Sequence, residues 1–585
     1  MSNHWNRRAA GACAAALLLT CAAAAFAQSA DKIYTGGDIV TMDEAHLFAE
    51  AVATHDGRIL AVGRLADVER FADEGTERVD LGGRTMLPGF IDPHGHFLSA
   101  GAWAQQVDLS PAPMGDVMDM ATLVERLSAE AEDGDGPIRG RGYDDTLLAE
   151  KRHPTRADLD EVSTERPVII THISGHVAVG NSKALEMAGV DAETADPDGG
   201  RVVRDEATGE ATGVMEGNAR TLIQSLIPAD TEEDRLAGAR LASDMWIAAG
   251  FTTANDQPTD PATVDFYRRA LESGDLKLRL DYWPRITSLE AARAYPAVGS
   301  NRDVSGGRGM IVQGPVKLTI DGSPQGYTAH FSEPYMTQRP HDDGDYRGFS
   351  YWDDMEAFFD VVAGLHRDGW QITVHANGDE GIQNALDAYG AAMRAHPRSD
   401  ARHTLQHAQF TRPDQLDQMK ALGVNPSFFI GHTFYWGDRH KDVFFGAGRA
   451  EHMSPIKGAE ERGLIFTTHT DTPVTPIDGI QMIWSAVNRV STGGQTIGED
   501  ERVDPLSALK AITTNAAWQY FQEDEKGSIA PGKLADFVIL SDNPLTVGHL
   551  DPMAIKDIEV LETIVGGETV FEGEHGSIVA QHYAR

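Results

Sequence analysis

The sequence predicts an α/β protein in which a barrel of parallel strands is flanked by a small β domain. Two observations lead to this prediction. Strand-like runs followed by helix-like segments repeat over roughly 400 residues, which favours a parallel barrel over an open sheet but separates the two poorly. Both chain ends carry short strands and glycine turns, and each end is too small to bury its own face. We therefore expect the two ends to pair into one domain.

The 585 residues divide, in order, into a leader, a split β domain and a barrel with an insertion. Asp56-Gly57 is a hairpin signal in the first β-rich end, and Asp504-Pro505 opens a late helix of the barrel. The expected segments are the leader (1–27), the first part of a β-sandwich (31–86), the barrel (87–525, with an insertion at about 100–240) and the second part of the β-sandwich (526–585).

The leader has the pattern of a secretory signal peptide. Two arginines precede a short apolar run that ends in the small-residue cleavage site Ala25-Phe26-Ala27. Cleavage near Ala27 and a periplasmic or secreted mature protein are expected. A lipoprotein acylated on Cys21 is a minor alternative. Both cysteines of the chain lie in this leader, so the mature protein would hold a metal with nitrogen and oxygen ligands alone.

The charge balance limits the kinds of partner. Fifty Lys and Arg against 89 Asp and Glu give a net charge of −39, which would repel nucleic acid and anionic membranes. No segment after the leader is long and apolar enough for a membrane span. A small-molecule substrate is therefore expected, and the sequence leaves monomer and homodimer open.

The first candidate for a metal site is His94-Gly95-His96, at the end of an apolar run. In a strand, residues i and i+2 point to the same face, so the two imidazoles would project together as half of a metal site. A His-x-His pair alone is a weak signal, because surface or core histidines give the same pattern.

Further candidate ligands follow other apolar runs. His375 and His407 end strand-like segments, Asp471 follows another, and Lys317 lies inside one that would bury it. Each residue alone has an ordinary explanation: a core histidine, a loop or cap aspartate, or a lysine at a solvated strand edge. If each residue had only its ordinary explanation, several polar residues would have to follow apolar strands independently of one another. In a barrel the carboxyl ends of the strands meet at one mouth, so a shared site explains them together. The nitrogen and oxygen set suits zinc, iron or manganese, with zinc the expected ion.

These motifs resemble those of the amidohydrolase superfamily, and within it the YtcJ-like branch, amidohydrolase family 3. The resemblance covers nearly the whole mature chain. It rests on LPGFIDPHGH (87–96), GH (175–176), VKLTIDGS (316–323), VHANGD (374–379), LQHAQ (405–409), HTDTPV (469–474) and GKLADFV (532–538).

The resemblance implies a (β/α)8 barrel with a composite β-sandwich from both chain ends, and a site for one or two metal ions. His94 and His96 would bind the more buried ion together with Asp471. Lys317, carboxylated on its amine by carbon dioxide, would bridge the two ions. The second ion would be held by His375 and His407.

One departure from the family pattern concerns the residues before Asp471. Where the family usually has the tripeptide Gly-Ser-Asp, this chain has His469-Thr470-Asp471. His469 shares a face with Asp471 in a regular strand, so it would crowd the site or contact substrate. Glu216 is a rival carboxylate, which we interpret as a polar barrel residue.

The predicted activity is metal-dependent hydrolysis of an amide-type, non-peptide C–N bond in a small molecule. Asp471 would be the general base that later hands its proton to the leaving amine. His432, with Tyr435 or Trp436, and His176 from the insertion are candidates for substrate contact, although loop packing explains them equally well. Asp144 and Asp145 would reach the pocket or serve the structure.

Two other kinds of function stay open. Related barrels act as deaminases, cyclic amidases or esterases, and the sequence excludes none of these. A non-catalytic periplasmic binding protein is disfavoured, because a binding module has no need for Asp471.

Overall fold

Parallel strands alternate with helices through the middle of the chain, which confirms the α/β prediction. The computed structural model describes residues 28–130, 136–175, 177–197, 200–286, 288–295, 302–337 and 344–573, so the predicted leader with both cysteines lies outside the described residues. One sheet has the order β17-β18-β16-β15-β8, comprising Arg302–Asp303, Ile311–Gln313, Arg279–Pro284, Phe251–Thr259 and Phe90–Ile91. A second, entirely parallel sheet has the order β19-β20-β21-β22-β23, comprising Val316–Thr319, Ile372–Ala376, Thr404–His407, Asn425–Phe429 and Thr467–His469.

The two sheets adjoin at β18 and β19, which are separated only by Gly314 and Pro315. Proline has no N–H to donate to a ladder, so a break at this point is expected. At the opposite side, the His96 N–H donates to the Thr472 carbonyl at 2.8 Å, which brings the end of β8 close to the end of β23. Among the described strands, no ladder closes the two sheets into one ring.

Amphipathic helices cover these sheets. In α11 (Met355–Arg367), the buried side chains of Phe358, Val361, Val362 and Leu365 follow the 3.6-residue period of a helix that faces a core. The carboxylate of Asp354 accepts hydrogen bonds from two N–H groups of the first turn and fixes the start of this helix. Other covering helices are α8 (Glu232–Ala248), α9 (Pro261–Ser273), α12 (Asp379–Ala395), α13 (Pro413–Leu422) and α18 (Gly479–Asn488).

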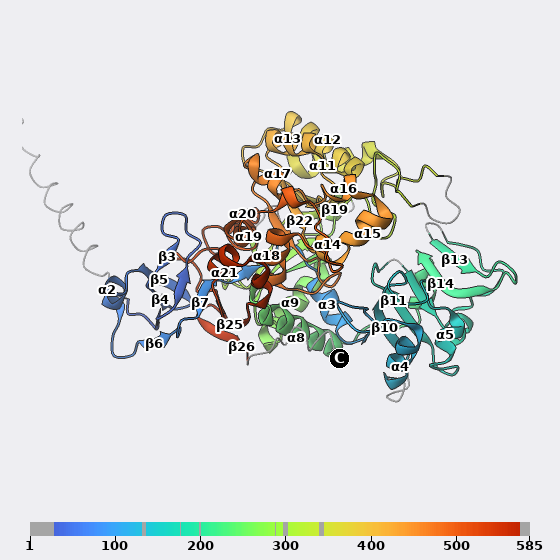
Figure 1. Cartoon of the computed structure of the whole chain (residues 1–585), viewed down its shortest axis with the longest axis horizontal. Helices are drawn as coiled ribbons and strands as arrows, with labels where there is room; N and C mark the ends of the chain where they lie inside the picture. Colours follow the sequence, from blue (N-terminus) through green and yellow to red (C-terminus); the bar gives the residue numbers. More distant parts are fainter. Residues whose placement is uncertain are drawn as a thin grey trace, which may run out of the picture.

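Strands from both chain ends pair in one sheet with the order β26-β25-β24-β7-β2-β3 (Figure 1). β7 (Thr85–Pro88) runs antiparallel to β24 (Phe537–Leu540), which joins the N-terminal β2 (Asp38–Val40) and β3 (Phe48–Ala49) to β25 (Val560–Val565) and β26 (Glu568–Glu572). A separate four-stranded sheet has the order β5-β4-β1-β6, comprising Arg58–Gly63, Ala51–His55, Lys32–Thr35 and Glu77–Asp80. A buried ion pair of Arg279 with Asp536, at 2.6 and 2.9 Å, ties the C-terminal segment to β16.

An inserted lobe, residues 107–224, lies apart from the parallel sheets and is coloured blue-green to teal in Figure 1. Its sheet has the order β13-β14-β12-β11-β10-β9, comprising Gly200–Arg204, Ala211–Gly217, Val177–Gly180, Val168–His172, Ile138–Tyr143 and Val107–Asp108. Helix α4 (Met120–Glu130) packs Leu123 and Leu127 against this sheet, in a hydrophobic cluster distinct from that of the main body. The lobe therefore has a core of its own.

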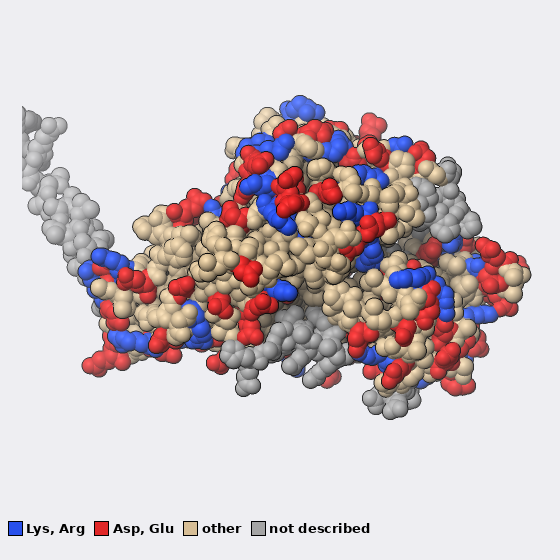
Figure 2. Space-filling model, in the orientation of Figure 1, with Lys and Arg blue, Asp and Glu red and all other residues tan. Residues whose placement is uncertain are grey.

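The surface and the helices add two observations. Figure 2 shows acidic and basic side chains mixed over the visible face rather than gathered into a patch of one sign. None of the helices in the described part of the chain combines the length and apolarity needed to cross a membrane.

Candidate metal centre

The residues predicted as ligands gather at the carboxyl ends of the parallel strands, where barrel enzymes place their chemistry. Lys317 lies on β19, His375 on β20 and His407 at the end of β21. His94 and Asp471 follow the outer strands β8 and β23.

The Asp471 carboxylate is the meeting point of the two outer strands. Its Oδ1 lies 2.8 Å from Nε2 of His94 and 3.1 Å from Nε2 of His96. Burial alone would raise the pKa of Asp471, but the imidazoles of His94 and His407, with the hydrogen bonds from His94 and His96, hold it well below its usual value. Asp471 and His407 also adopt left-handed backbone conformations, with φ of 56° and 69°, which cost about 1–3 kcal/mol each and are retained mainly at functional sites.

His375 and His407 form a second pair. Nε2 of His407 lies 2.8 Å from Nδ1 of His375, and the side-chain amide of Asn377 lies 3.1 Å from the other nitrogen of His375. Nδ1 of His407 is buried without a hydrogen-bond partner in the described structure. The pair therefore leaves one imidazole nitrogen unsatisfied beside Asp471.

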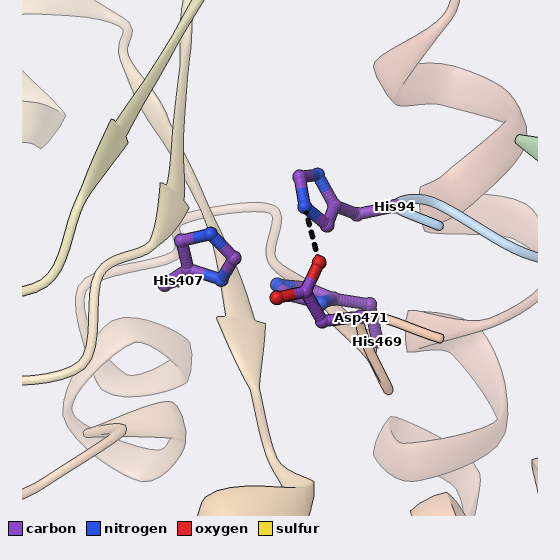
Figure 3. Close-up of side chains that lie close together, drawn as sticks. All are labelled: His94, His407, His469 and Asp471. Carbon is purple, nitrogen blue, oxygen red and sulfur yellow. Dashed lines mark ion pairs between the residues drawn. The ribbon is translucent and has the colours of Figure 1, made fainter. Parts of the chain in front are cut away.

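His469 completes a compact group with His94, His407 and Asp471, and one ligand atom from each lies within 4.8 Å of the others (Figure 3). Its ring centroid is 4.6 Å from that of His94 and 5.1 Å from that of His407. Burial lowers the pKa of His469 to about 3, with smaller opposing effects from Asp471 and from the Ser427 backbone. The imidazole is therefore uncharged at neutral pH.

Lys317 is buried against the same group. Desolvation lowers the pKa of its amine to about 7, and Asp471 opposes this shift. A large share of the amine is thus uncharged near neutral pH, which is unusual for a lysine.

This donor set fits a divalent metal ion. Burial, together with the charge of Lys317, lowers the pKa of His94 well below its usual value, and burial does the same for His407, so both rings are in the neutral form that binds metals. The Gln257 amide lies 2.6 Å from Nδ1 of His94, and its Oε1 has no partner among the described residues. The same amide nitrogen donates to Oδ1 of Asn255 at 2.8 Å, so it is fixed as a donor beside Nδ1 of His94 while Nε2 of His94 faces Asp471.

A cavity of about 240 Å³ opens beside this group, between the strand ends and the inserted lobe. His375, His407 and Asp471 line it, whereas His94 and His469 are not among its lining residues. The lobe contributes Asp144, Asp145, Thr146, His172, Ile173 and Ser174 to the opposite wall.

The residues predicted to contact substrate have different positions. His432 lines the cavity and packs on Phe429, with ring centroids 3.9 Å apart. Trp436 also lines the cavity but Tyr435 does not, because residues 431–435 form helix α14 (Gly431–Tyr435) and positions four apart share a helix face. His176 lies outside the described residues.

Glu216, the rival carboxylate, lies on β14 of the inserted lobe rather than on a barrel strand. It pairs with Arg201 on the adjacent strand at 3.2 Å, in a partly exposed position. Sequence reasoning missed His172 and Gln257. His172 ends an apolar strand, β11, which is the signal that identified His375 and His407, whereas Gln257 lies in the polar second half of β15 and carries no such signal.

A clasp of Arg439 and Asp144 joins the inserted lobe to the main body at the cavity wall. Nη1 of Arg439 lies 2.6 Å from Oδ2 of Asp144 and donates to the Thr146 hydroxyl at 2.8 Å. Burial would raise the pKa of Asp144, but Arg439 holds it below its usual value. Beside the clasp, Asp145 lies 3.1 Å from His172.

The comparisons with known proteins agree with the motifs. The sequence matches the family described as "Amidohydrolase family" over residues 77–571. It is 28% identical over 567 residues to the putative amidohydrolase YtcJ of Bacillus subtilis (92% of this chain, 99% of that protein). It is 27% identical over 558 residues to the N-substituted formamide deformylase of Arthrobacter pascens (93% and 99%). A solved structure of an uncharacterised metal-dependent hydrolase from Pyrococcus horikoshii shares the fold, with a TM-score of 0.71 at 24% identity (89% and 99%). The resemblance carried by the sequence motifs is confirmed.

Removal of the arginine of the clasp should loosen the inserted lobe. Arg439→Met would leave Asp144 as a buried carboxylate without its ion-pair partner, at a local cost of about 3 kcal/mol. Amide hydrogen exchange of residues 138–148 should become faster, as followed by mass spectrometry. Arg156→Met is a matched control, because it removes an exposed pair with Glu210 and should cost about 1 kcal/mol or less. Equal exchange in both variants would show that the clasp does not hold the lobe.

Proposed function

Because this chain belongs to the amidohydrolase family, we propose that it is a metal-dependent hydrolase that cleaves a non-peptide C–N bond of amide type in a small molecule. The observation that carries the proposal is the buried group of His94, His407, His469 and Asp471 at the wall of a cavity. The name of the Arthrobacter pascens relative, an N-substituted formamide deformylase, supports an amide-type bond.

The proposed centre takes one or two divalent ions, with zinc the expected metal. His94, His96 and Asp471 would hold the first ion, His375 and His407 the second, and a carboxylated Lys317 would bridge them. When bound, the metal supplies a Lewis acid that polarises the scissile carbonyl and a lowered pKa for the attacking water.

The chain's own side chains then handle protons and orientation. Asp471 is ionised, because its pKa lies well below the usual value, so a carboxylate oxygen can accept the proton of the attacking water and return it to the leaving amine. Burial and the neighbouring His440 keep His432 neutral, and its Nδ1 has no partner among the described residues, so the ring can hydrogen-bond the substrate at the cavity wall.

Three further features belong to the proposal. The adjoining sheets would be the two halves of a (β/α)8 barrel, and the sheet shared by both chain ends would belong to a composite β-sandwich; both are supported by the strand orders. Export through cleavage near Ala27 is supported by the leader pattern, and N-terminal sequencing of the mature protein would test it.

A substrate panel with metal analysis tests the activity. N-formyl amines, N-acyl amino acids, cyclic amides and aryl esters are offered to the enzyme, with ammonia release followed to detect deamination. Hydrolysis of an amide, abolished by exhaustive metal removal and restored by zinc, is expected. Activity that survives metal removal would sink the proposal, and binding without turnover across the panel would indicate a binding protein.

Asp471→Asn should separate the base from the metal site. The amide keeps an oxygen in place but cannot accept the proton, so kcat should fall by about 100-fold to 10,000-fold while metal stays bound. Steady-state kinetics and elemental analysis check both parts. Asp265→Asn, an exposed carboxylate paired with Arg268, is the control and should retain activity. Full activity in the Asp471 variant would exclude this residue as the base.

Carboxylation of Lys317 should depend on pH around its lowered pKa of about 7. Below that pH the amine is protonated and cannot attack carbon dioxide, and above it the amine is uncharged and reacts. A carbamate signal in the 13C NMR spectrum of protein equilibrated with labelled bicarbonate should therefore grow as pH rises through 7. Lys317→Met should lose the signal and Lys277→Met, at a half-exposed position, should keep it. A signal lost in neither variant would contradict the proposal.

A further inference from the structure

We propose that His469 is a metal ligand, a third imidazole that joins His94 and His407 around the Asp471 carboxylate. The inference rests on the proposed metal-dependent function. It differs from the two-ion arrangement that the family resemblance implies, because His407 would share one ion with His94, His469 and Asp471. Three properties of the His469 side chain support this inference: its position beside Asp471, its unsatisfied ring nitrogens and its absence from the cavity lining.

The position of His469 follows from the strand that bears it. β23 ends at His469, and the chain turns at Asp471, whose backbone is left-handed with φ of 56°, so that both side chains lie in the same group. Figure 3 shows the His469 ring behind the Asp471 carboxylate, with His94 and His407 on other sides of that carboxylate. Donor atoms that lie within 4.8 Å of one another can converge on a single ion with little movement.

Neither ring nitrogen of His469 makes a hydrogen bond of good geometry in the described structure, although the Ser427 backbone lies near enough to oppose the fall in its pKa, and the residue is 0% exposed. A buried polar atom left unsatisfied costs about 1–3 kcal/mol. One nitrogen of an imidazole is commonly tolerated as a weak acceptor, but two unsatisfied nitrogens in one fully buried ring indicate that a group outside the chain completes the site.

Contact with substrate explains this ring less well. His469 is absent from the residues that line the cavity, whereas His375, His407 and His432 are among them. Its ring packs against Phe429, with ring centroids 5.3 Å apart, and Phe429 rather than His469 lines the open volume at this point. Simple packing explains it no better, because an apolar side chain would fill the space without the cost of the unsatisfied nitrogens.

Three neutral imidazoles and one carboxylate form a nitrogen-rich donor set of the kind that binds zinc. His94, His407, His469 and Asp471 come from three strand ends, β8, β21 and β23. The ion they share would be the most tightly held one, and it would be lost last during chelation.

Replacement of His469 should weaken the binding of zinc. In His469→Gln, the affinity for zinc measured by competition with a chromogenic chelator should fall by more than about 100-fold, the upper range for loss of a supporting group alone. X-ray absorption at the zinc edge, on protein loaded with one equivalent, should show one imidazole fewer. His440→Gln is the matched control, since His440 is also fully buried with a partnerless ring nitrogen but lies outside the ligand group, and its zinc affinity should stay unchanged.

A second measurement uses the unmodified protein, in case the variant fails to fold. Hydrogen exchange at the C2 position of the His469 ring, followed by mass spectrometry, should slow when one equivalent of zinc is added. Unchanged zinc affinity in a folded His469→Gln, or unchanged C2 exchange, would overturn this inference. Wild-type protein that binds no metal at all would instead overturn the proposed function.

Discussion

The structure depends on one buried carboxylate. Asp471 contacts His94 and His96, which brings the end of the first parallel strand to the end of the last, across 375 residues of sequence between His96 and Asp471. A charged carboxylate in a buried site must be compensated, because desolvation of an unpaired charge is costly. Burial lowers the pKa of the surrounding imidazoles of His94 and His407, so neither brings a full compensating charge, and of the two only His94 is within hydrogen-bond distance of the carboxylate.

Two nearby groups can supply positive charge, and neither is a full counterion. The pKa of Lys317 is about 7, so its charge is partial near neutral pH. The pKa of His96 is lowered by burial, but its contact with Asp471 raises it above the usual value. A divalent cation would balance this charge and would bind the imidazole nitrogens that have no partner among the described residues. The electrostatics and these nitrogens therefore support the same proposed metal centre.

Much of this centre could be predicted from sequence, because its members follow a local rule. His94, His375, His407 and Asp471 each come at or just after the end of an apolar strand, and parallel strand ends meet at one edge. Tyr435 shows where the rule stops: the segment after β22 is a helix, so Trp436 faces the cavity in its place. The Arg439–Asp144 clasp spans 295 residues and follows no local pattern, so only tertiary packing could place it.

In this fold, the proposed metal binding and the shaping of the cavity are assigned to different parts of the chain. The strands that position the proposed ligands belong to the main body, while the lobe, with its own hydrophobic core, supplies the facing wall of the cavity. Substitutions in the lobe can therefore reshape what the cavity accepts without disturbing the residues that perform the chemistry. Because the two walls of the cavity are stabilised by separate hydrophobic cores, the shape of the cavity and the position of the strand ends can vary independently in this fold.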